Sequence, residues 1–129
     1  VAVMFSHIHQ TRLSWLSLTA PEFAEDLASL FRQEGENRLP EYDKERVAQA
    51  LNESAKAIGE AVKNRLETGQ AMKGKNATYE HPILLLQHML WHEGYHVGQM
   101  KLALKAIGYV MRDEEEEKAI WGMWRLEQW

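Results

Sequence analysis

Apolar residues recur at spacings of three and four along the middle of the chain, and this period limits the possible folds more than any other feature. From Asp43 onward the recurring positions are Val47, Leu51, Ala55, Ile58, Val62 and Leu66. This spacing places them on one stripe of an amphipathic helix. Asp43 suits the N-cap position, and Gly69 suits the residue just after the last turn. The pattern therefore predicts a helix over residues 44–68.

Two more long helices are predicted on either side of this one. The segment from Val1 to about Ser17 has a helical apolar period. A second long helix is predicted from Pro82, a residue favoured at the first helical position, to Gly108. Residues 83–86 at its beginning are apolar on every side, which predicts that this helix is the most buried element.

Shorter elements complete the expected organisation. Thr19 and Glu22 fit a capping box that would open a short helix reaching about Phe31. Asp113 would cap a last helix, whose acidic first turn suits the positive end of the helix dipole. Residues 33–40 and 69–80 are polar and are expected to be loops, and no alternating strand pattern is present. We therefore expect one all-α domain over residues 1–129, an antiparallel four-helix-bundle type with short loops, a short extra helix and a C-terminal helix.

Composition excludes several classes of protein. The 129 residues fit one domain, and 45% hydrophobic with 26% charged residues is ordinary for a globular chain. No apolar run approaches the roughly 20 residues of a membrane span, which excludes a transmembrane protein. The net charge of −4 gives no basic surface for nucleic acid. The absence of cysteine excludes disulfides, thiolate metal sites and a cysteine nucleophile, and it suits a cytoplasmic protein.

The histidines of the second long helix carry the strongest chemical signal. His92 and His96 are four residues apart, which on a helix corresponds to about 6 Å of rise and 40° of rotation. They therefore project from one face and can bind the same metal ion, while His88 extends the row by one turn. Two hydrogen-bonded core histidines are the simpler reading of such a pair. Because two ligands leave a metal site incomplete, a third must come from elsewhere.

The first helix offers the candidates for that third ligand. His7 and His9 lie roughly 200° apart on a helix, so only one is expected to face inward, and His7 is favoured by its neighbours. His81 sits at a helix start and is expected to be a cap or surface residue. Three imidazoles would leave an open position for water or substrate, which is the pattern of catalytic rather than structural sites.

Three stretches of the chain carry a family pattern. The first is Phe5-Ser6-His7-Ile8, followed by Arg12 and Trp15-Leu16. The second is Trp91-His92-Glu93-Gly94-Tyr95-His96-Val97-Gly98-Gln99, followed by Leu104 and Gly108. The third is the carboxy-terminal Trp121-Gly122-Met123-Trp124. Together they resemble the DinB-like family of metal-binding four-helix bundles, with the two histidine motifs specific as a pair.

The resemblance implies a site and an activity class. In that family one histidine of the first motif and two of the second bind a divalent metal, which implies His7, His92 and His96 here, with His9 as the fallback. Characterised relatives include thiol S-transferases and isomerases that use mycothiol or bacillithiol, and dimers are common. We therefore expect a homodimer with one zinc, nickel or iron ion and a small-molecule substrate, such as a low-molecular-weight thiol. Whether the chain is an enzyme of the transferase, isomerase or hydrolase type, or a non-catalytic metal-stabilised dimeric module, stays open.

One departure from the family bears on the fold. The family has a helix before the first histidine motif, whereas this chain begins inside that motif. A bundle without that helix would expose an apolar face. We expect the helix to exist in the parent protein, or another chain to cover the face.

The residues around the histidine pair have further candidate roles. Glu93, next to His92, is expected to be solvent-facing or to lie near the metal, and Gln99 and Tyr95 could act near the metal. His88 could be a fourth ligand. The pentapeptide His92-Glu93-Gly94-Tyr95-His96 also matches the HExxH signature of zinc proteases, in which the glutamate is the general base. The metzincin extension of that signature is absent, because Gln99 and Leu102 replace its glycine and third histidine.

Overall fold

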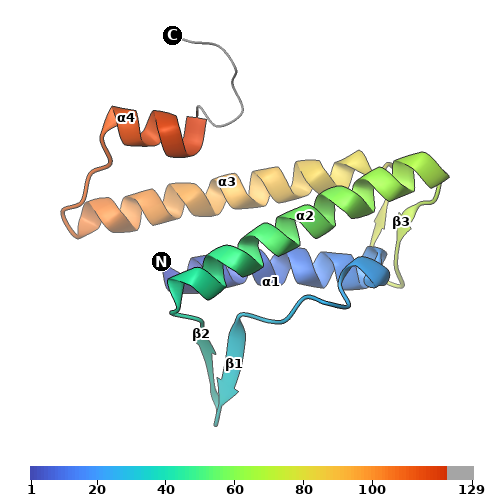
Figure 1. The fold of residues 1–129 in the computed structure, drawn as a ribbon, viewed down its shortest axis with the longest axis horizontal. Helices are drawn as coiled ribbons and strands as arrows, with labels where there is room; N and C mark the ends of the chain where they lie inside the picture. Colours follow the sequence, from blue (N-terminus) through green and yellow to red (C-terminus); the bar gives the residue numbers. More distant parts are fainter. Residues whose placement is uncertain (122–129) are drawn as a thin grey trace. The chain divides into compact units, whose positions relative to one another are not determined.

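A computed structural model describes residues 1–121 of the chain. The chain divides into two compact units, the first from Val1 to His96 and the second from Val97 onward. The protein is mostly helical, with two small pairs of strands (Figure 1). The helical class expected from the sequence is confirmed, whereas the expected absence of strands is wrong.

Helix α2, Lys44–Thr68, is formed as the apolar period predicts. The Asp43 side chain accepts hydrogen bonds from the backbone N–H groups of Glu45 and Arg46, both at 3.0 Å. These bonds satisfy two of the donors that every helix leaves free at its N-terminus. Gly69 follows with φ of 69°, the left-handed conformation that suits glycine at a helix end. Both predicted ends of this helix are therefore confirmed.

Helix α1, Ala2–Thr19, continues past its predicted end. The hydroxyl of Thr19 donates to the carbonyl of Trp15 at 2.7 Å, so Thr19 closes this helix and does not cap a new one. Only a short 3-10 turn, η1, follows at Pro21–Phe23. The predicted helix reaching Phe31 is wrong, because the residues of the capping box are divided between the end of α1 and this turn.

The two segments expected to be polar loops instead hold β-hairpins. Strands β1, Phe31–Glu34, and β2, Asn37–Pro40, pair antiparallel around Gly35, which has φ of 60°. A glycine with positive φ at this position suits a two-residue hairpin turn. Strands β3, Met72–Lys73, and β4, Thr78–Tyr79, form the second pair.

The second hairpin packs closely on the end of α1. Met72 is fully buried in the core. A Cβ atom at Gly74 would overlap the backbone carbonyl of Leu18, so only glycine permits this approach. One buried side chain and one close backbone contact therefore hold a segment whose composition resembles a loop.

The three long helices do not all alternate in direction. His9 and Arg12 of α1 lie against Ala50 and Leu51 of α2, and Glu22, just after α1, pairs with Arg65 near the end of α2. Residue numbers increase in the same direction along the two helices, so α1 and α2 run parallel. The long connection over residues 20–43 joins them. The expected antiparallel helices with short loops are wrong for this pair.

Helix α3, Ile83–Ala106, runs opposite to α1 over the part that belongs to the first unit (Figure 1). Arg12 of α1 contacts Glu93, while the later Trp15 contacts the earlier His88. Residue numbers therefore decrease along α3 in the direction in which they increase along α1. In this unit the long helices run in two directions, with α3 antiparallel to both of the others.

The core of the first unit lies where these helices meet the second hairpin. Its buried members are Leu16, Ala20, Ala24, Ile58, Ala61, Val62, Met72, Leu85 and Met89. At the start of α3 Leu85 is buried, whereas Ile83 and Leu84 are 46% and 37% exposed. The apolar first turn on which the prediction of a most buried helix rested is therefore only partly buried, and part of its apolar surface remains uncovered in the described residues.

The second unit contains the end of α3 and a short helix. Gly108, with φ of 88°, follows α3, and the N–H of Tyr109 donates to the carbonyl of Leu104, as in a Schellman cap. Helix α4, Asp113–Glu116, begins one residue earlier than predicted, because Arg112 and not Asp113 is at the N-cap. A π-helical turn, η2, follows at Glu117–Trp121. The tryptophan-rich motif continues beyond residue 121, outside the described residues. Within residues 1–121, no helix is both long and apolar enough to cross a membrane.

Candidate metal centre

Three histidines from two helices meet at one point of the first unit. His7 lies on α1, and His92 and His96 lie one turn apart on α3. The Nε2 atom of His92 lies 3.2 Å from Nε2 of His7 and 3.2 Å from Nε2 of His96. One ring nitrogen from each histidine lies within 4.8 Å of the other two. Within the described residues, this is the group of side chains that could hold a metal ion.

The spacing of the nitrogens fits a small divalent ion. Imidazole nitrogens bound to one tetrahedral zinc at roughly 2.0–2.1 Å lie about 3.3 Å apart. The two separations from His92, 3.2 Å each, are close to this value, and all three nitrogens lie within 4.8 Å of one another. A donor set made only of imidazole suits zinc, nickel or iron.

The environment also keeps the rings in the form that binds metal. Burial lowers the pKa of His92, and the neighbouring His96 and His7 lower it further. The pKa of His7, which remains partly open to solvent, is lowered first by partial desolvation of its ring, then by His96 and by Arg38 of β2. A histidine must be neutral to bind a metal ion, so these shifts favour the required form. Nδ1 of His92 is buried and has no hydrogen-bond partner among the described residues.

An ion pair beside the histidines joins α1 to α3. Nε and Nη2 of Arg12 donate to the two carboxylate oxygens of Glu93, at 2.7 and 2.6 Å. Nη1 of the same guanidinium donates to the carbonyl of Leu51 at 2.7 Å and to the hydroxyl of Ser54 at 3.2 Å. One arginine therefore links all three long helices, in the two-pronged geometry that makes such pairs strong.

The ion pair also bears on whether the glutamate of the HExxH motif can act as a general base. Both oxygens of Glu93 accept hydrogen bonds from Arg12, and only 24% of the Glu93 side chain is exposed. A protease general base needs a carboxylate that can take a proton from a metal-bound water. The geometry makes Glu93 a positioning residue next to His92 and does not favour the protease interpretation.

The other histidine candidates have different surroundings. His9 is 1% exposed, and its Nδ1 and Nε2 lie 3.0 Å and 2.8 Å from the carbonyl oxygens of Ala50 and Ala28. Because both ring nitrogens face carbonyl groups, His9 ties α1 to α2 and to the following loop. The fallback role of His9 as a ligand is not supported by this arrangement.

His88 belongs to a separate aromatic cluster. Its Nδ1 lies 2.7 Å from the hydroxyl of Tyr79, and its ring meets Trp15 edge to face. Burial raises the pKa of Tyr79 to about 12, so the phenol keeps its proton in this contact with His88. His88 is therefore not part of the three-histidine group in this structure. His81 accepts a hydrogen bond from the N–H of Ile83 at 3.3 Å, as expected of a cap.

Tyr95 and Gln99, the two other residues expected near the metal, lie in different units of the chain. The Tyr95 ring packs edge to face on His96 with centroids 5.3 Å apart, and Tyr95 is 58% exposed. It therefore lies at the rim of the histidine group. Gln99 belongs to the second unit, so its place near the metal stays a prediction.

Sequence reasoning missed three residues that shape the site. Arg12 entered only through the family resemblance, although it is the one formally charged residue in α1. Such a charge indicates a buried partner. Tyr79 and Arg38 lie in the two hairpins, whose strands carried no recognisable sequence signal.

Comparison with known families gives one match. The model of the DinB family matches residues 1–122. Neither the search of curated proteins nor that of solved structures finds a match.

We expect the Arg12–Glu93 pair to contribute strongly to stability. Arg12→Met or Glu93→Leu alone leaves one charge poorly compensated and should lower the free energy of unfolding by about 2–4 kcal/mol. The double variant should lose less than the sum of the two, because the partners interact directly. Urea denaturation measures all three. The exposed pair Lys56–Glu60 is the control, and its removal should cost about 0.5 kcal/mol or less. Strictly additive losses would show that the two charges do not act together.

The metal-free protein should lose stability on mild acidification. The pKa values of His7 and His92 are lowered in the folded state, whereas unfolded histidine titrates near about 6.5. Below that pH the unfolded state binds more protons, so the free energy of unfolding should fall as pH decreases from about 6.5. Urea denaturation between about pH 7.5 and 5 measures this, above the range in which carboxyl groups titrate. His92→Gln should flatten the dependence, and an equal slope in this variant would contradict the assignment.

Proposed function

The chain belongs to the DinB family, and on that premise we propose that it binds one divalent metal ion through His7, His92 and His96. The proposal rests on one observation above all: ring nitrogens from two helices converge at metal-ligand spacing. Zinc, nickel and iron all accept such a donor set. The bound ion would act as a Lewis acid on a group in its open coordination position.

We propose a small-molecule substrate that carries a thiol, and a reaction of the transferase, isomerase or hydrolase type. Three protein ligands leave room for a substrate atom, as in catalytic metal sites. His7 is exposed, so its side of the group is accessible to solvent. In this proposal the lowered pKa values of His7 and His92 keep the rings neutral. Arg12 and Glu93 hold α1 and α3 in register, and the Tyr95 ring borders the entrance. A cytoplasmic setting, which the absence of cysteine suits, is part of the same proposal.

A non-catalytic metal-stabilised module is the second candidate. It is favoured by the position of the three ligands, because a metal joining α1 to α3 would stabilise the fold whether or not it reacts. Thiol exchange distinguishes the two candidates. An absorption change of the cobalt-substituted protein on adding a small thiol supports an open catalytic position. A spectrum that does not respond supports a structural site.

The metal content of the untagged protein tests the proposal directly. Elemental analysis should find about one divalent ion per chain, and His7→Ala or His92→Ala should each remove most of it, since two imidazoles bind far more weakly than three. His81→Ala, which changes an exposed histidine outside the group, is the matched control and should retain the metal. Circular dichroism confirms that each variant remains folded.

The possible results separate the ligand assignments. Metal retained in folded His7→Ala would exclude His7 as a required ligand. Metal-free wild-type protein that also fails to bind added zinc or nickel would overturn the proposal.

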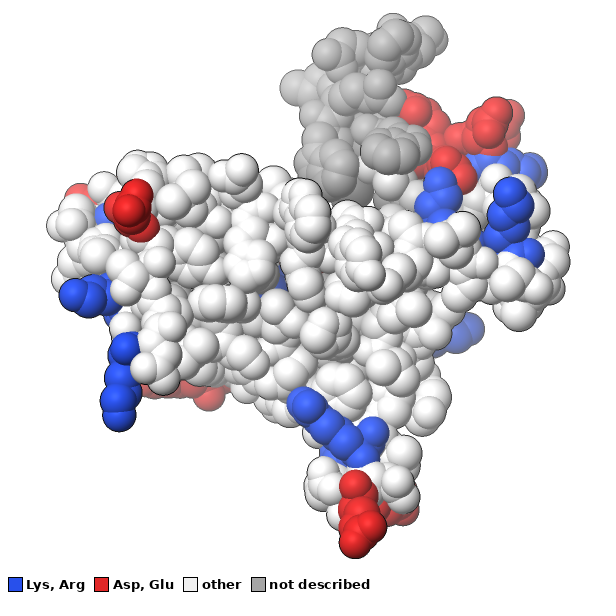
Figure 2. Space-filling view, turned by 180° about the vertical axis from the view of Figure 1, so that it is seen from behind, with Lys and Arg blue, Asp and Glu red and all other residues white. Residues whose placement is uncertain are grey.

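We also propose a homodimer in which a second copy completes a four-helix arrangement. Arg12 is the one formally charged residue of α1, and Glu93 is the one among residues 83–96 of α3. These two neutralise each other. Figure 2 shows a broad surface with few charged side chains on the face opposite to the view of Figure 1. On α3, Leu90, Trp91 and Tyr95 are 67%, 78% and 58% exposed, which is unusual for large apolar residues outside an interface.

Light scattering tests the homodimer. The wild type should have the mass of two chains at micromolar concentration. Trp91→Glu should shift it towards one chain, because a charge would be buried in the interface. Lys63→Glu, on the exposed side of α2, is the control for added negative charge and should leave the mass unchanged. A monomeric wild type would contradict the homodimer without affecting the metal proposal.

A further inference from the structure

Arg38, on strand β2, is a cation whose charge reaches the histidine group. This charge is one of the causes that lower the pKa of His7. Among residues 1–121, no carboxylate lies within ion-pair distance of the Arg38 guanidinium. Arg32 on the neighbouring strand differs, because it reaches Glu34 at 4.0 Å. Arg38 therefore presents a positive charge that no acidic group of the described chain neutralises.

A series of contacts fixes the hairpin beside the turn of α1 that carries His7. Gln10 lies three residues after His7, which makes the two side chains neighbours on the helix surface. The hydroxyl of Ser29 donates to Oε1 of Gln10 at 2.7 Å. The oxygen of the same hydroxyl accepts from the N–H of Phe31, the first residue of β1, at 3.0 Å. The base of the hairpin is therefore held against this turn of α1.

Phe31 in turn holds the guanidinium of Arg38. Pro40 is the partner of Phe31 in the strand pair, and Arg38, two residues before Pro40, projects from the same face of the hairpin. The central carbon of the guanidinium lies 4.1 Å from the centre of the Phe31 ring. A cation over an aromatic face is attracted by the charge distribution of the ring. Packing therefore sets the position of the charge, although Arg38 is exposed.

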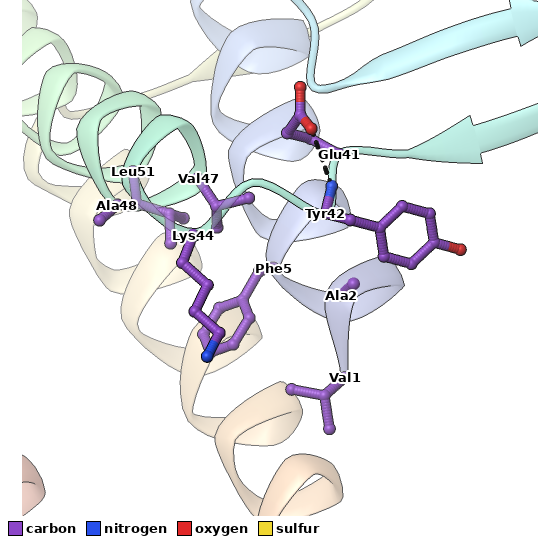
Figure 3. Close-up of a pocket in the computed structure, with 9 residues that line it drawn as sticks. All are labelled: Val1, Ala2, Phe5, Glu41, Tyr42, Lys44, Val47, Ala48 and Leu51. Carbon is purple, nitrogen blue, oxygen red and sulfur yellow. Dashed lines mark hydrogen bonds between the residues drawn. The ribbon is translucent and has the colours of Figure 1, made fainter.

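The end of β2 is also fixed. The N–H of Glu41, the residue after β2, donates to the carbonyl of Leu30 at 2.8 Å. The Glu41 carboxylate accepts from the N–H of Tyr42 at 2.9 Å (Figure 3) and pairs with Arg46 at 3.0 Å. These bonds anchor β2 where it leads into α2, and they engage the Glu41 carboxylate with partners other than Arg38.

An arginine held in this way suits a carboxylate. A guanidinium that packs on an aromatic ring keeps N–H donors available at its edge. Two of these donors can bind both oxygens of one carboxylate, as Arg12 does with Glu93. A neutral amide or alcohol cannot make this pair of charge-assisted bonds. Arg38 therefore offers a binding point for an acid beside the exposed histidine of the group.

We propose that the substrate is a thiol acid, with its sulfur at the metal and its carboxylate on Arg38. The inference rests on the proposed thiol substrate and narrows it to one chemical class. Its basis is that packing holds Arg38 beside the turn of α1 that carries His7, the exposed ligand. A substrate bound at both points is selected by its charge as well as by its sulfur.

Absorption titration of the cobalt-substituted full chain tests this inference. The probes are 3-mercaptopropionate and 6-mercaptohexanoate, each compared with its uncharged amide. At least one acid should bind at least five-fold more tightly than its amide. Arg38→Gln should bring this ratio close to one and should retain the cobalt, because Arg38 is not a proposed ligand. Arg32→Gln, the same change on the paired strand, should leave the ratio unchanged.

The comparison of acid with amide in the same variant cancels any effect of the Arg38 charge on the metal itself. Equal binding of acids and amides by the wild type, an unchanged ratio in Arg38→Gln, or an equal loss in Arg32→Gln would each overturn the inference and leave the metal site standing. A cobalt spectrum that responds to none of the thiols would overturn the thiol substrate and this inference together. A chain that takes up no cobalt would overturn the metal proposal as well.

Discussion

The Arg12–Glu93 ion pair is the interaction on which the rest of the first unit depends. Arg12 is the one formal charge of α1, and burying it requires hydrogen-bond partners for its guanidinium. Nε and Nη2 donate to Glu93, and Nη1 donates to Leu51 and Ser54 of α2. The pair thereby sets the rotation and height of α1 against both neighbours, which places His7 opposite His92 and His96. The same interaction removes Glu93 from acid–base chemistry, so the motif that resembles a protease signature serves to position a histidine.

The parallel course of α1 and α2 follows from the long connection between them. A short loop can join only antiparallel neighbours, whereas residues 20–43 are long enough to return the chain to the same end. The apolar period of a helix defines which face is buried, but it contains no information about the direction of a neighbour. The sequence therefore predicted the extent of α2 correctly, while its direction relative to α1 was wrong. The expected short loops were wrong for the same reason.

Local signals explain which parts of the site could be predicted. The helical spacing of His92 and His96 requires no tertiary information, and Asp43 and Gly69 mark the ends of α2 by their own chemistry. The preference for His7 over His9 depended on which face of the first helix turns inward. The structure brings His7 close to His92 and His96. Tyr79 could not be found in this way, because its partner His88 is reached through a hairpin held by Met72 and Gly74. Such contacts depend on packing between distant segments and leave no period in the sequence.

The charge balance around the histidines favours a thiol as the proposed substrate. In the proposed site the three histidines would bind the metal as neutral imidazoles, and Glu93, next to His92 in the sequence, is already neutralised by Arg12. A divalent ion bound there would keep most of its charge, unlike one held by carboxylate ligands. A larger uncompensated charge lowers the pKa of a bound acid more, so a thiol would be held as thiolate at neutral pH. Arg38, whose charge helps to lower the pKa of His7, adds to the positive potential that an approaching anion meets. The proposed arrangement would therefore stabilise an anionic sulfur without a protein carboxylate acting as a base.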